Sequence, residues 1–188
     1  MQAVNRGDHR YTAYFCEENA WWLAHDLVVG GTAADDLTIL FFSNPGRQVL
    51  LMNQASAAEG ALLCWDYHVV VRRRSGSVDE IMDFDTRLGF PVTTMHYVEA
   101  TFPRQSLLPP PYRAMVRQVA AASYLERFQS DRSHMQERLQ ADRFPRYPPI
   151  QARAPAKAID LGEYWDMRRT LIDGSRAVPL TAMFPGRG

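Results

Sequence analysis

An apolar run from Ala61 to Val71 is the feature that most limits how this chain can fold. The run is rich in valine and aromatic residues, and three arginines and a Ser75-Gly76-Ser77 turn follow it. An apolar run bounded by a turn is typical of a buried strand. We therefore expect a central strand from about Ala61 to Arg73, and an antiparallel partner strand from Val78 to Phe84 across the turn.

The central strand carries residues that could do chemistry. Because side chains alternate along a strand, Cys64, Asp66 and His68 are expected on one face. The partner strand ends in Asp83-Phe84-Asp85. Pairing across a short turn can bring Asp83 or Asp85 within reach of His68, and the sequence alone leaves the register open.

A helix is expected to begin at Cys16. Glu17 and Glu18 suit the positive N-terminal end of a helix, and Gly30-Gly31 is a typical stop. A helix N-terminus stabilises a thiolate, so we expect a lowered pKa for Cys16, and its free backbone N–H can face an oxyanion. Cys16 is therefore preferred over Cys64 as a nucleophile. Cysteine, histidine and aspartate in this order fit a nucleophile, its base and an orienting carboxylate.

Structural interpretations of the same residues stay open at this point. A lone cysteine is usually a small buried hydrophobic residue, and a lone histidine in a strand is often a hydrogen-bonded core residue. His134, in a polar loop beside Asp131, is a rival base, although a structural hydrogen-bonded cluster also explains it. Asp66 is a rival orienting residue, but side chains two positions apart on one strand run roughly parallel. It could instead bind substrate or cap a loop.

The other expected elements make an α+β fold with a mostly antiparallel sheet flanked by helices in one domain, residues 1–188. Further strands are expected over residues 37–43, 48–52 and 115–122, the first two as a hairpin and the third with helix left open. Helices are expected over residues 123–128 and 160–166, the second capped by Asp160 with Glu163. The remaining segments are a loose lead-in (1–12), a short helix or irregular stretch (94–102), an extended connector (103–111) and a turn-rich tail that the sequence predicts poorly (174–188).

Composition excludes several classes of partner. The 188 residues include 21 basic and 21 acidic ones, and a net charge of zero argues against nucleic acid or an anionic membrane. No apolar stretch approaches the roughly 20 residues of a membrane span, and no secretory signal is evident. The five histidines show no metal-ligand spacing, so we expect no metal and no cofactor. These features favour a reduced, soluble, intracellular protein, and we expect a cytoplasmic monomer.

Several blocks of the sequence together resemble the protein N-terminal glutamine amidohydrolase family, whose members share a Trp-Asp-Tyr-His-Val signature. The signature matches Trp65 to Val69 here, and the resemblance runs in order from about residue 14 to about residue 150, fading after Asp160-Leu161. This leaves any role of the C-terminal segment open. The matching blocks are residues 14–19, 42–44, 54–55, 65–70, 83–86, 90–91, 97–99, 123–125, 130–135 and 147–148.

The resemblance implies a papain/transglutaminase-like α/β/α sandwich and a triad of Cys16, His68 and Asp83. It implies that the chain converts the side-chain amide of an N-terminal glutamine on proteins or peptides to glutamate and releases ammonia through a glutamyl thioester. In eukaryotes this reaction feeds an arginine-based degradation (N-degron) pathway, and the protein would then also be expected in the nucleus.

Specificity for a free α-amino group calls for an anionic or carbonyl-rich pocket. The candidate binding residues are Glu18, Asp66 and Asp85, each of which could equally be a helix-end or loop-capping acid. Two competing functions are a related cysteine protease or transglutaminase-type acyl transferase, and a non-catalytic module that binds peptide N-termini. The presence of all three triad residues argues against the non-catalytic module.

Overall fold

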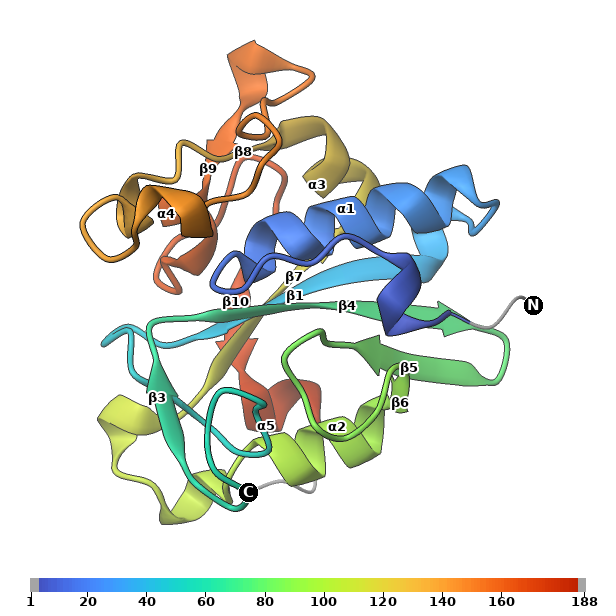
Figure 1. Cartoon of the computed structure of the whole chain (residues 1–188). Coiled ribbons are helices and arrows are strands. Elements are labelled where there is room, and N and C mark those ends of the chain that lie inside the picture. Colours follow the sequence, from blue (N-terminus) through green and yellow to red (C-terminus); the bar gives the residue numbers. More distant parts are fainter. Residues whose placement is uncertain (1–3, 186–188) are drawn as a thin grey trace.

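A six-stranded antiparallel sheet is the centre of the structure, a computed structural model that describes residues 4–185. Its strand order is β10-β7-β1-β4-β5-β6, and every neighbouring pair is antiparallel (Figure 1). This confirms the predicted α+β class. The strands are β1 (Leu37–Ser43), β4 (His68–Ser75), β5 (Val78–Met82), β6 (Val92–Thr93), β7 (Met115–Ala120) and β10 (Ala177–Pro179).

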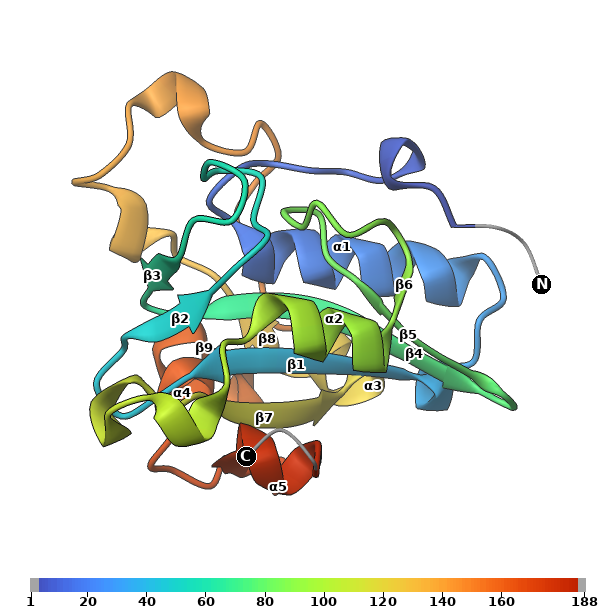
Figure 2. The same cartoon turned by 90° about the horizontal axis from the view of Figure 1, so that it is seen from below.

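Helices cover both faces of this sheet. On one face lie α1 (Cys16–Val29), α3 (Ala121–Arg127) and α4 (Leu161–Trp165), and on the other lie α2 (Thr94–Thr101) and α5 (Leu180–Met183), as Figures 1 and 2 show. Alternate residues of the central strands therefore pack into two different apolar cores. Burial on both faces explains why these strands appear in the sequence as continuous apolar runs. Between residues 4 and 185, no helix combines the length and the hydrophobicity needed to cross a membrane.

The predicted central strand is in fact two strands. The chain forms β3 (Leu63–Trp65), leaves the ladder at Asp66 and Tyr67, and starts β4 at His68. Ser43 at the end of β1 donates a hydrogen bond from Oγ to the Asp66 carbonyl at 2.6 Å, which holds this break. The prediction that Cys64, Asp66 and His68 share one face of a strand is therefore wrong. Side chains alternate between the two faces only along an uninterrupted strand.

The predicted hairpin between residues 37–43 and 48–52 is also wrong. The strand β2 (Val49–Leu51) pairs with β3 in a separate two-stranded sheet, and β1 instead lies between β4 and β7. A second small sheet joins β8 (Phe128–Gln129) in parallel to β9 (Ile159–Asp160). Local turn residues such as Asn44-Pro45-Gly46 signal a change of direction, but they do not specify which strand becomes the partner.

Most of the other predicted elements are confirmed. The helix at Cys16 runs to Val29, the strand β7 and the helices α2 and α3 form, and α4 has the predicted capping box of Asp160 and Glu163. The predicted hairpin of β4 and β5 forms with Val71 opposite Met82. The connector at residues 103–111 is not simply extended, because short 3-10 turns form at Gln105–Leu107 and from Pro110, where proline suits a first helical position.

The predicted loose lead-in is held against the rest of the molecule. Of its residues, 1–3 lie outside the described part. From Val4 onward the segment is tied down: Arg6 donates from Nη2 to the Thr86 carbonyl at 2.9 Å, and Tyr11 donates from Oη to Asp85 at 2.6 Å. Both contacts are to the loop after β5, so the lead-in lies beside the residues that the sequence singled out for chemistry.

The tail contains more regular structure than the sequence indicated. Residues 186–188 lie outside the described part, but β10 extends the sheet beside β7 and α5 follows it. Arg117 of β7 is fully buried and donates hydrogen bonds to four backbone carbonyls in the segments that lead to β10. The four carbonyls belong to Tyr164, Asp166, Arg169 and Ser175. A buried arginine with this many acceptors joins the C-terminal segments to the sheet.

Candidate active site

A buried ion pair joins His68 to Asp83. His68 opens β4 and Asp83 follows the last residue of β5, so the antiparallel register brings His68 Nε2 to 3.0 Å from Asp83 Oδ2. Both side chains are almost completely buried. Tyr97 on α2 donates to Asp83 Oδ2 at 2.9 Å, and the Asp85 backbone N–H donates to Asp83 Oδ1 at 2.9 Å. These contacts fix the carboxylate relative to the imidazole ring.

The electrostatics favour the charged forms of both partners. Burial acts against both charges, but the charge of His68 and the hydrogen bonds to Asp83 outweigh it, so the pKa of Asp83 is lowered. Burial likewise opposes protonation of His68, but the Asp83 carboxylate outweighs it and the pKa of His68 is raised. Neither buried ring nitrogen of His68 has a well-aligned hydrogen-bond partner among residues 4–185, but Nε2 is ion-paired with Asp83, which leaves Nδ1 unengaged. It is therefore free to exchange a proton with another group.

Cys16 is the first residue of α1 and lines a small pocket together with Asp83 and Asp85. Its Sγ donates to Glu17 Oε2 at 3.7 Å. The expected lowering of the Cys16 pKa is not found: burial and the negative charges of Glu17 and Asp85 raise the pKa of the thiol. The partial charge of a helix N-terminus is about half an elementary charge, so two nearby carboxylates and burial outweigh it.

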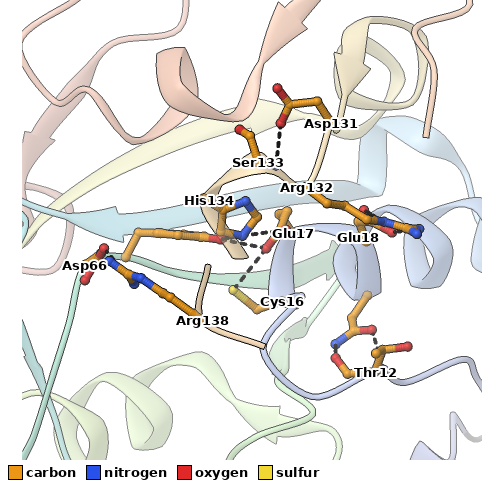
Figure 3. A network of polar contacts seen from close by, with 12 residues as sticks. Thr12, Cys16, Glu17, Glu18, Asp66, Asp131, Arg132, Ser133, His134 and Arg138 are labelled. Atoms are coloured by element: carbon orange, nitrogen blue, oxygen red, sulfur yellow. Dashed lines mark hydrogen bonds and ion pairs between the residues drawn. The ribbon is translucent and has the colours of Figure 1, made fainter. Parts of the chain in front are cut away.

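His134 lies in a polar cluster that includes Cys16, which Figure 3 shows from close by. Its Nε2 is 3.2 Å from Tyr67 Oη, and Tyr67 donates from Oη to Glu17 Oε2 at 2.9 Å. Burial lowers the pKa of His134 and raises the pKa of Glu17 to about 8. His134 is thus part of a hydrogen-bonded cluster. The histidine that contacts Asp83 is His68.

The three candidate residues for binding an amino group lie in different surroundings. Glu18 is fully buried, and both of its oxygens accept from Arg132, at 2.8 Å each (Figure 3). Asp66 is partly exposed and forms ion pairs with Arg47 at 2.8 Å and Arg138 at 3.5 Å. Asp85 is the only one of the three that lines the pocket with Cys16.

Comparison with known proteins identifies the family of the chain. The family model described as N-terminal glutamine amidase matches residues 11–180. The chain belongs to this family. Proteins named "Protein N-terminal glutamine amidohydrolase" from Oryza sativa subsp. indica and Arabidopsis thaliana are each 36% identical to it, over 135 and 142 residues. The protein of the same name from Homo sapiens is 35% identical over 133 residues.

The matches cover most of this chain but less of its relatives. They span 68%, 72% and 68% of this chain, and 58%, 64% and 63% of the rice, Arabidopsis and human proteins. The family match includes Cys16, His68 and Asp83 and extends to residue 180, beyond the segment where the sequence blocks alone were recognisable.

In this family member, sequence reasoning missed several residues of the site. Tyr97, which holds Asp83, and Tyr67, which contacts Glu17, both lie in blocks that resemble the family, but the sequence indicated no role for their hydroxyl groups. Arg132 is likewise in such a block, and only the structure shows its pairing with Glu18. Tyr11 lies before the first block, in the segment expected to be loose.

His68, Asp83 and Asp85 could in principle hold a metal ion, because one ligand atom from each lies within 4.8 Å of the others. The direct His68–Asp83 ion pair and the hydrogen bond from the Asp85 N–H to Asp83 already explain why these three side chains lie close together. We therefore assign these residues no metal.

Proposed function

We propose that the chain is an amidohydrolase that converts N-terminal glutamine on proteins or peptides to glutamate and releases ammonia. The buried His68–Asp83 ion pair, beside a helix that begins with Cys16, is the observation that carries the proposal. Relatives named protein N-terminal glutamine amidohydrolase support it. The chemistry needs a free thiol, and Cys16 and Cys64 are both free, in keeping with a reducing compartment such as the cytoplasm.

In the proposed acylation step, the Cys16 side chain turns from Glu17 toward His68, whose Nδ1 takes the thiol proton. The sulfur then attacks the side-chain amide carbon of the substrate. The Cys16 backbone N–H at the start of α1 can donate to the developing oxyanion, because the first N–H groups of a helix have no intrahelical partner. His68 gives its proton to the leaving ammonia, and a glutamyl thioester remains.

In the proposed hydrolysis step, His68 takes a proton from a water molecule that attacks the thioester. Collapse of the tetrahedral intermediate expels the thiolate, which regains its proton from His68, and glutamate leaves. Asp83 keeps Nε2 protonated throughout, so Nδ1 is the nitrogen that exchanges protons. Tyr97 in turn holds Asp83 in place.

We propose Asp85 as the group that receives the α-amino group of the substrate. It is partly exposed, lines the pocket with Cys16, and is positioned by the Tyr11 hydroxyl at 2.6 Å. A carboxylate there would favour an ammonium group and disfavour an internal glutamine, whose peptide N–H carries no charge.

The activity is tested with a panel of short peptides, with product mass and released ammonia as readouts. A peptide that begins with a free glutamine is expected to gain the mass of a deamidated product. Peptides with an acetylated N-terminal glutamine, an N-terminal asparagine or only an internal glutamine are expected to remain unchanged. Conversion of internal glutamine, cleavage of a peptide bond or incorporation of an amine would instead indicate a broader acyl transferase or protease.

Asp85→Asn tests the proposed amino-group site. We expect KM for the free glutamine peptide to rise about tenfold with a much smaller change in kcat, because a hydrogen bond to a charged group contributes about 1.5–3 kcal/mol. Steady-state kinetics measure this, and Asp142→Asn, at an exposed acid far along the chain, is the control. An unchanged KM in Asp85→Asn, or a rise in Asp66→Asn instead, would contradict the assignment.

A further inference from the structure

A chain of polar groups leads from Cys16 to the protein surface. Glu17 Oε2 accepts from Cys16 Sγ at 3.7 Å and from Tyr67 Oη at 2.9 Å, and Tyr67 Oη lies 3.2 Å from His134 Nε2. Figure 3 shows the Glu17 carboxylate between the Cys16 sulfur and the His134 ring. Each neighbouring pair is within contact distance, so protons can pass along the chain from one titratable group to the next.

The far end of this chain meets a pocket that opens to solvent. His134 lines this pocket together with Asp66, Arg138 and Trp165, and its side chain is 14% exposed. The near end is the proposed nucleophile. The buried Glu17 carboxyl group therefore has a path for proton exchange with solvent that does not pass through His68.

Glu17 lacks the partners that a purely structural buried carboxylate normally has. Its Oε1 has no hydrogen-bond partner among residues 4–185, and the nearest cationic atom described for it is His134 Nε2 at 3.6 Å. The adjacent Glu18, equally buried, is by contrast fully paired with Arg132. A buried carboxylate without a full ion pair favours its neutral form, which agrees with its pKa of about 8.

We propose that Glu17 is a protonation gate on Cys16. In its neutral form Glu17 can donate its O–H to the sulfur and supports the thiolate, whereas the carboxylate form opposes the thiolate by charge repulsion. The proton on Glu17 comes from solvent by way of His134 and Tyr67, and the thiol proton still passes to His68. The gate rests on the proposed function, because it assumes that Cys16 is the nucleophile.

Other ionisable groups face this chain from every neighbouring element. Tyr124 of α3 donates from Oη to the Glu17 carbonyl at 3.1 Å. Glu18, Asp66, Asp131 and Arg138 act through their charges on Glu17 or His134, and Asp83 and Asp85 act through theirs on Cys16, whereas Cys16 and Tyr67 hydrogen-bond to Glu17. Glu17 is the only one of the carboxylates among these that contacts the sulfur.

The gate predicts how the reactivity of the Cys16 thiol depends on pH. As pH rises through about 8, Glu17 loses its proton and the new charge resists formation of the thiolate. Glu17→Gln keeps the shape of the neutral form and cannot ionise. It should therefore move the midpoint of thiol ionisation down by at least about one pH unit. Tyr67→Phe removes a hydrogen bond that favours the Glu17 carboxylate, so it should shift the midpoint in the same direction by less.

The experiment follows alkylation of Cys16 by iodoacetamide from pH 6 to 10 in a Cys64→Ala background, with Glu137→Gln at an exposed position as the control. A charge effect speeds alkylation only above about pH 8, where Glu17 is ionised in the parent protein, and so lowers the midpoint, whereas loosened packing raises the rate at every pH. Unchanged midpoints in folded Glu17→Gln and Tyr67→Phe would overturn the gate. Because alkylation needs no substrate, a failure to deamidate any glutamine peptide would count against the proposed function and not against the gate.

Discussion

Cys16→Ala is expected to reduce turnover of an N-terminal glutamine peptide by at least about 10³-fold, because it removes the thiol that we propose forms the thioester. The remaining activity would come from positioning alone. Cys16 is only partly buried and begins a helix whose core residues lie further along, so the fold should persist. Ammonia release measures the turnover, and thermal unfolding with circular dichroism checks that the variant is folded.

Cys64→Ala is the matched control, because Cys64 is exposed on β3. It should keep the activity of the parent protein. If Cys16→Ala retained a tenth or more of the activity while Cys64→Ala lost it, the nucleophile would be Cys64 and not Cys16. If both variants stayed active, a thioester mechanism would be excluded.

Arg132→Met is expected to lower the free energy of unfolding by about 3–5 kcal/mol, the usual effect of breaking a buried ion pair. Arg132 donates from Nε and Nη2 to the two oxygens of Glu18, and also to the carbonyls of Pro145 and Tyr147. Removing the guanidinium group leaves the buried charge of Glu18 without its partner. Urea unfolding followed by tryptophan fluorescence measures the change.

Two comparisons separate the loss of charge pairing from the loss of packing. The double variant Arg132→Met/Glu18→Gln carries no unpaired charge and should be more stable than Arg132→Met alone. Arg47→Met removes an exposed pairing with Asp66, with side chains 47% and 36% exposed, and should cost no more than about 1 kcal/mol. Equal effects of Arg132→Met and Arg47→Met would show that the buried pair contributes little.

The parts of the site that depend on local patterns were predictable. A turn after an apolar run indicates a hairpin, and the β4–β5 hairpin brings Asp83, one of the two aspartates left open, to His68. Helix-start acids after Cys16 correctly placed the beginning of α1. These signals work because each lies within a few residues of the feature that it specifies.

The parts that depend on distant partners were not predictable. The break before His68 is held by Ser43 of another strand, and nothing in the apolar run marks it. Glu18 resembles an ordinary helix-start acid until Arg132, far along the chain, is seen to pair with it. The raised pKa of Cys16 has partly the same origin, since burial and Asp85 come from the tertiary fold and, together with the adjacent Glu17, outweigh the local helix dipole.

The two margins of the main sheet are both unsuited to pairing with a second molecule. One margin is β6, which has two residues, and the other is β10, which has three and ends in Pro179. Proline has no backbone N–H to offer, and very short border strands give an incoming chain little to align with. By pairing with Met115, Val116 and Arg117, β10 covers half of the six-residue β7 and conceals backbone groups that would otherwise be open to a second chain. The C-terminal segment thus shortens the open edge that the sheet offers to a second chain.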